Sequence, residues 1–102
     1  MASRSEHFQA LVDRLPEKEL FRFSLAQALE AEGREEAALP HYELCVAKRA
    51  DWMMPRILLG KILLKLGRRT DAKPLLTAAL QLAIEQNHED PERELRALLA
   101  DL

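Results

Sequence analysis

The sequence predicts an all-α fold of about six helices arranged as antiparallel pairs. The strong helix formers Ala, Leu, Glu, Arg, Lys and Gln dominate the 102 residues, whereas aromatic residues make up only 5%. The chain also repeats itself at an offset of 34, because LAQALEAEGREEAALPHYELC from position 25 aligns with LGKILLKLGRRTDAKPLLTAA from position 59. Each copy carries a Gly-Arg pair and a Pro at the same places. A period of this length is typical of helical-repeat proteins.

Each repeat is predicted to be a helix, a glycine turn and a second helix. The first helices are expected over 17–32 and 52–66, and each ends at a glycine, Gly33 or Gly67. Glycine adopts the left-handed conformation that closes a helix at little cost. Pro55 fits the opening turn of its helix, where an amide has no intrahelical partner.

The second helices are expected over 35–48 and 70–86. Pro40 and Pro74 lie near their starts, and we expect them to cost little because the first amides of a helix have no acceptor within it.

Two further helices flank the repeats. Residues 5–15 match a second helix without its first helix, and Pro16 closes the segment. At the other end, Asp90 is predicted to be an N-cap, with Pro91 as the first helical residue. Leu residues then form one apolar stripe over 90–102, which is typical of a helix that caps a stacked array: Leu95, Leu98, Leu99 and Leu102.

The repeat resembles the tetratricopeptide repeat. In that family the first helix carries a Leu followed by a small residue, and then a bulky residue. The second helix carries a small residue, then an aromatic or bulky residue, and then another small residue. Here these places are filled by Leu25–Ala26 and Leu59–Gly60, Leu29 and Leu63, Ala38 and Ala72, Tyr42 and Leu76, and Cys45 and Ala79.

The sequence departs from the family pattern at two places. Arg22 and Arg56 stand where the family has Trp, and the closing Pro is present only as Pro16. The resemblance implies one domain over 1–102 with an α-solenoid, or superhelical, architecture. Within it, 5–15 is an orphan second helix, 17–50 is the first repeat, 51–86 is the second repeat, and 90–102 is a C-terminal cap.

The residues offer no catalytic or metal-binding motif. Cys45 stands alone, so it provides neither an intrachain disulfide nor a Cys-based zinc site, and its position predicts a packing role. Glu85 and His88 form a single Glu-x-x-His, whereas a di-iron bundle needs two such motifs. We therefore expect no enzyme activity, no metal and no cofactor.

The resemblance implies that the chain binds a peptide segment in a concave groove lined by the first helices. The predicted wall is apolar with lysines at one rim, so we expect an amphipathic or acidic segment of an unknown protein as partner. The groove residues by position in the repeat are Leu20, Phe23, Gln27, Glu30, Met54, Ile57, Leu58, Lys61, Leu64 and Lys65. An alternative is that the C-terminal helix folds over this groove, in which case Phe23 and Ile57 are core residues.

Charge is segregated along the chain, although the total is only −2. The net charge is −4 over 17–47, +6 over 48–73 and −4 over 74–102. One basic block between acidic flanks disfavours nucleic-acid binding and favours internal ion pairs. It leaves two alternatives open: a homodimer or other self-assembling unit, and, less favoured, an RNA-associated repeat. No segment matches the length of a membrane span or a signal peptide, so we expect a cytoplasmic protein.

Overall fold

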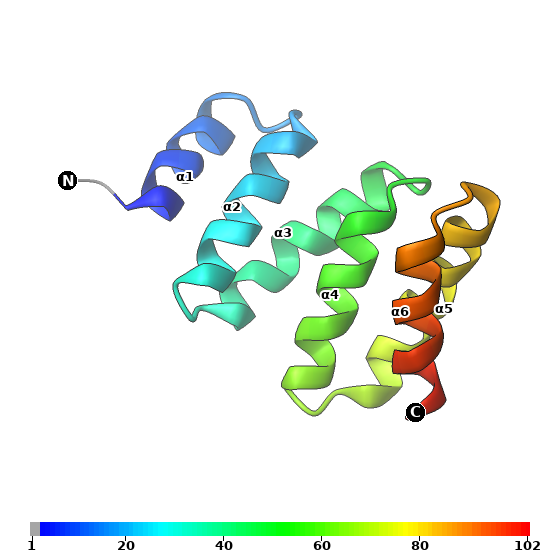
Figure 1. Ribbon diagram of the computed structural model, residues 1–102. Coiled ribbons are helices and arrows are strands. Elements are labelled where there is room, and N and C mark those ends of the chain that lie inside the picture. The colour runs from blue at the N-terminus through cyan, green and yellow to red at the C-terminus, as the bar shows by residue number, and fades with distance from the viewer. Residues whose placement is uncertain (1–2) are drawn as a thin grey trace. The chain divides into compact units, whose positions relative to one another are not determined.

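The computed structural model describes residues 3–102, which form six α-helices and no strand (Figure 1). The helices are α1 (Arg4–Arg14), α2 (Glu19–Ala31), α3 (Glu35–Lys48), α4 (Met53–Lys65), α5 (Arg69–Glu85) and α6 (Glu89–Ala100). The predicted all-α class and helix number are confirmed. The chain divides into a unit of α1–α3, ending at Ala50, and a unit of α4–α6, beginning at Asp51. None of the helices within 3–102 combines the length and the apolar character needed to cross a membrane.

The sequence period is present in the helix bounds. The offset that aligns the two repeats also relates both ends of α4 to those of α2, and the start of α5 to that of α3. Helix α2 begins at Glu19, two residues later than expected, and α5 begins one residue earlier. The period then lengthens, because α6 begins two residues later than the same offset from α4 would place it. This shift aligns Leu59 of α4 with Leu95 of α6.

Both hairpin turns depend on a left-handed glycine, as predicted. Gly33 and Gly67 each have φ +78°. The amide of Gly33 donates to the Glu30 carbonyl at 3.0 Å, and the next amide donates to the Leu29 carbonyl at 2.9 Å. Gly67 repeats this pattern with the carbonyls three and four residues before it. A side chain at this φ strains the backbone, so glycine fixes where each first helix ends.

Two expectations about prolines are wrong. Pro40 and Pro74 are each the sixth residue of their helices, beyond the amides that lack an intrahelical acceptor. Each therefore removes one helical hydrogen bond, to the carbonyl of Glu36 or Thr70. Pro55 is the third residue of α4, where a missing amide costs nothing, as expected.

The start of α6 also differs from expectation. The N-cap is His88 rather than Asp90, and Pro91 is the third helical residue rather than the first. Asp90 and its acidic neighbours lie in the first turn instead, where they interact favourably with the positive helix end.

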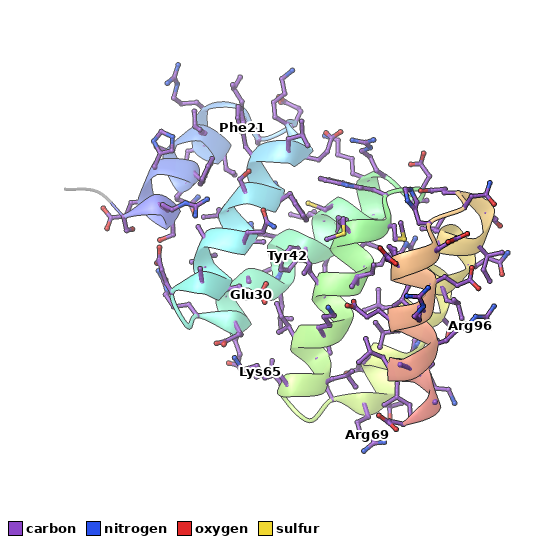
Figure 2. The ribbon with its side chains drawn as sticks, viewed as in Figure 1. Phe21, Glu30, Tyr42, Lys65, Arg69 and Arg96 are labelled. Carbon is purple, nitrogen blue, oxygen red and sulfur yellow. The ribbon has the colours of Figure 1, made fainter. Side chains whose placement is uncertain are left out.

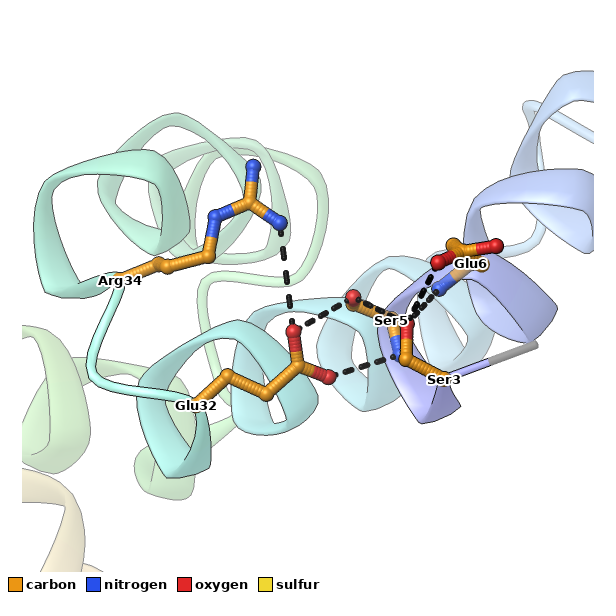
Figure 3. Close-up of polar contacts among 5 residues, drawn as sticks. All are labelled: Ser3, Ser5, Glu6, Glu32 and Arg34. Atoms are coloured by element: carbon orange, nitrogen blue, oxygen red, sulfur yellow. Dashed lines mark hydrogen bonds and ion pairs between the residues drawn. The ribbon is translucent and has the colours of Figure 1, made fainter. Parts of the chain in front are cut away.

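Helix α1 is attached to α2 by polar groups as well as by apolar packing (Figure 3). The hydroxyl of the buried Ser5 donates to Oε1 of Glu32 at 2.7 Å, and the Ser5 amide donates to Oε2 at 3.2 Å. Ser3 caps the same helix by accepting from the Glu6 amide. Glu32 thereby places a carboxylate at the positive end of α1.

In the unit of α1–α3, helix α2 packs against both of its neighbours. The α2–α3 contact combines small side chains with the large Tyr42. Ala26, Ala38, Tyr42 and Cys45 are fully buried. The predicted packing role of Cys45 is therefore confirmed.

In the unit of α4–α6, helix α5 packs against α4 and α6. Gly60 lies at a close approach of α4 and α5, because a Cβ placed there would lie 2.6 Å from Cδ2 and 2.8 Å from Cγ of Leu76. Leu76 is fully buried, as is Leu95 on the inner face of α6. The small residue of the predicted Leu–small pair in α4 thus allows α5 to pack close to the α4 backbone.

Gly60→Ala tests this close approach, because its effect on the free energy of unfolding should change sign when Leu76 is shortened. The clash with Leu76 should outweigh the better helix propensity of Ala and lower the free energy of unfolding by about 1 kcal/mol. In a Leu76→Ala background the clash is gone, so Gly60→Ala should raise the free energy of unfolding by up to about 1 kcal/mol. Urea denaturation followed by circular dichroism measures both. Equal effects in the two backgrounds would contradict the packing described.

Candidate functional site

The ten residues predicted to line a binding groove lie on two helices. Leu20, Phe23, Gln27 and Glu30 belong to α2, and the other six belong to α4. These helices are in different units, so each face is described within its own unit.

The α2 face is partly apolar and open to solvent. Leu20 is 60% exposed, and Gln27 is also exposed. Phe23 and Glu30 are half-buried. Single exposed apolar residues are common on protein surfaces, but an exposed Leu at a predicted binding position is a candidate contact.

Tyr42 of α3 connects two of these residues. Its hydroxyl donates to Oε1 of Glu30 at 2.9 Å, and its ring makes an edge-to-face contact with Phe23 at a centroid distance of 5.9 Å. Figure 2 shows the Tyr42 and Glu30 side chains directed toward each other. Because Tyr42 is fully buried, it holds the side chains of Phe23 and Glu30 in place from the core side of α2.

The α4 face combines exposed and buried side chains. Met54 is 43% exposed, and Lys65 at the other end of the helix is exposed as well. Leu58 and Leu64 are half-buried. Ile57 is buried, so it supports the face from within.

Lys61 of α4 forms an ion pair with the C-terminal helix. Its Nζ lies 2.7 Å from Oε1 of Glu94 on α6. Both side chains are exposed by two fifths or more. Sequence reasoning did not identify Glu94, because the ion pair with Lys61 is a contact between two helices, which a repeat alignment does not give.

Other residues of the basic block 48–73 also make contacts inside their own units. Lys48 donates to the Glu17 carbonyl at 2.5 Å, and Arg49 lies 3.8 Å from Glu19. In the other unit, Arg68 pairs with Asp71 at 3.0 Å, and Arg69 donates to the Asp101 carbonyl. The internal ion pairing expected from the charge pattern is therefore present.

A hollow of about 270 Å³ lies between the starting turn of α2 and the end of α3. Its apolar lining comes from the exposed Leu44 and two smaller residues, and its polar lining from the cations and one acid. The lining residues are Pro16, Glu19, Arg22, Leu44, Ala47 and Lys48. The adjacent Cys45 thiol donates to the Glu19 carbonyl at 3.5 Å.

Two buried groups of this unit, Cys45 and Tyr42, and the half-buried His41 have shifted pKa values. Burial raises the pKa of Cys45 to about 11, since a buried thiolate loses its hydration. Burial, together with the hydrogen bond to Glu30, raises the pKa of Tyr42. Burial, followed by the charge of Arg22, lowers the pKa of His41, whose Nδ1 lies 3.4 Å from the Arg22 guanidinium. At neutral pH all three side chains are therefore uncharged.

Within residues 3–102, no three His, Cys, Asp or Glu side chains come together in a way that could hold a metal ion. Comparison of the chain with protein-family models, with curated proteins and with solved structures gave no match.

The raised pKa of Cys45 predicts a loss of stability in alkali. The folded protein binds the thiol proton more tightly than the unfolded chain does. The resulting contribution to the free energy of unfolding is complete below pH 9.0 and is lost as the pH rises to about 11. The free energy of unfolding should fall by about 2–3 kcal/mol over this interval through Cys45 alone. Cys45→Ala introduces the residue that the second repeat has at this place, Ala79. It should remove the pH dependence that comes from Cys45 and retain the pH dependence that comes from Tyr42. Urea denaturation at pH 8 to 11 compares the two proteins, and parallel curves would contradict the assignment.

Proposed function

We propose that this chain is a non-catalytic protein–protein interaction module that binds a peptide segment of another protein. In this proposal it is a helical-repeat protein of the tetratricopeptide type, with its helix pairs stacked as an α-solenoid. The first helices α2 and α4 supply the binding surface, and the protein acts in the cytoplasm.

One observation carries the proposal: large apolar side chains are exposed at equivalent positions of both first helices. Leu20 is the second residue of α2, and Met54, its equivalent in the next repeat, is the second residue of α4. Their exposed fractions are 60% and 43%. The residues that the repeat pattern assigns to helix contacts are buried. The exposure of Leu20 and Met54 is therefore not a consequence of poor packing. Apolar groups that remain exposed in register are suited to contact a partner.

The contacts inside each unit support one rigid face on α2 and another on α4. Tyr42 holds Phe23 and Glu30 in place, and the buried Ile57 supports α4. A surface that is ordered before binding loses less conformational entropy when the partner docks.

The charges favour an amphipathic or acidic partner. Lys61 and Lys65 follow Met54 along α4, so an apolar contact and a basic contact lie on the same helix. Nucleic acid is disfavoured, because several cations of the basic block make ion pairs or hydrogen bonds within their units. Self-association through the same apolar residues is the alternative.

A displayed library of random 12-residue peptides, selected on the immobilised protein, tests the proposal. Selected peptides should contain an apolar residue near acidic residues. Their affinity for Leu20→Ser/Met54→Ser, measured by fluorescence anisotropy, should fall at least about tenfold, equivalent to about 1.4 kcal/mol. Raising the salt concentration should weaken binding because it screens the lysines.

The matched control is Leu44→Ser/Ile84→Ser. Leu44 and Ile84 are exposed to a similar degree, 48% and 40%, but lie on the second helices α3 and α5. This variant should bind the selected peptides as the parent protein does. Equal losses in both double variants would remove the first helices as the binding surface. A dimeric mass by light scattering that reverts to monomer in Leu20→Ser/Met54→Ser would instead support self-association.

A further inference from the structure

The ion pair between Lys61 and Glu94 bears on what the α4 surface binds. Lys61 occupies a predicted groove position, and a carboxylate of the same chain already lies 2.7 Å from its Nζ. The distance is that of a charge-assisted hydrogen bond. The structure thus contains an example of the chemistry that an acidic ligand would use at this position.

We propose that Glu94 is a resident competitor at this surface, and that an acidic side chain of the partner replaces it on Lys61. This inference rests on the proposed function and adds to it the residue that recognises the partner and the contact that restrains binding.

Both members of the pair are accessible to an incoming carboxylate. The side chain of Lys61 is 42% exposed and that of Glu94 is 49% exposed. An ion pair this exposed is worth at most about 1 kcal/mol, which corresponds to about a fivefold change in Kd. Exchange with a ligand is therefore inexpensive, so Glu94 can lower the affinity for acidic ligands without blocking them.

The attachment of α6 does not depend on this pair. Leu95, beside Glu94, is fully buried on the inner face of α6, and α6 packs against α5. Arg69 of α5 also donates to the Asp101 carbonyl after α6. Glu94 can release Lys61 while α6 remains docked, and only a side chain has to move.

The surroundings of Lys61 indicate that the acidic partner is also apolar. Leu58 and Leu64 are each three residues from Lys61 on α4 and half-buried, so each retains some accessible apolar surface. Residues at this spacing lie on neighbouring turns of one helix side. A segment that presents Leu and Glu together complements both features.

The test uses a fluorescein-labelled peptide of alternating Leu-Leu and Glu-Glu pairs, with a second peptide carrying Gln in place of every Glu. Glu94→Gln should bind the Glu peptide about three- to fivefold more tightly than the parent protein. When Lys61→Gln is added to Glu94→Gln, that gain in affinity should disappear. Neither substitution should change the affinity for the Gln peptide. Anisotropy titrations at low salt measure the affinities, and thermal denaturation verifies that each variant is folded.

Two matched variants control for net charge. Glu92→Gln removes an acid from the same helix, but Glu92 pairs with Arg96 of α6 at 3.0 Å and not with α4. Lys73→Gln removes an exposed lysine of α5. Both should leave the affinity for the Glu peptide within about twofold of the parent value, because an exposed charge that makes no direct contact with the ligand contributes little.

Each failure is distinguishable. The competition is refuted if Glu94→Gln behaves like Glu92→Gln, or if the Glu peptide binds neither the parent protein nor Glu94→Gln. The proposed function still stands in that case if library peptides bind through Leu20 and Met54. If neither the library peptides nor the Glu peptide binds, both proposals fail. If the Glu peptide alone binds, tightens on Glu94→Gln and loses that gain on Lys61→Gln, the exchange is supported and the binding surface is α4 without Leu20 of α2.

Discussion

The close approach of helix pairs through small residues is the constraint on which the rest of the structure depends. Gly60 leaves no room for a Cβ beside Leu76, and Ala26, Ala38, Ala72 and Ala79 are fully buried at related contacts. Because the backbones lie close together, a few large side chains are enough to fill each unit. This explains how a chain with 5% aromatic residues forms buried helix contacts. It also leaves other apolar residues, Leu20 and Met54 among them, outside the packing.

The fold was predictable to the extent that it depends on local rules. Glycine at φ +78° defines the hairpin turns, and the sequence period reproduces the starts of both helix pairs. The prolines were mispredicted although the helix starts were nearly right, because only the first four amides of a helix lack an intrahelical acceptor and both prolines lie beyond them. The N-cap of α6 was mispredicted because Asp90 satisfies the local preference for a capping side chain, whereas the helix begins at Glu89 and its cap, His88, makes no side-chain hydrogen bond.

The candidate site was predictable by position but not by environment. The period assigns residues to faces of α2 and α4, but it does not distinguish the buried Ile57 from the exposed Met54. It also does not identify Tyr42 as the support of Glu30, or Glu94 as the partner of Lys61. Those relations depend on contacts between helices.

The two prolines have a consequence for how the hairpins open. Each leaves the first turn of a second helix attached by one hydrogen bond fewer, next to a glycine turn. Local unfolding starts where backbone bonds are fewest and most exposed. We therefore expect the amide protons at the turn end of each hairpin to exchange before those in the rest of that hairpin, and a protease to gain access there. The later turns of α3 and α5, which contain the fully buried Cys45 and Ala79, are expected to exchange more slowly.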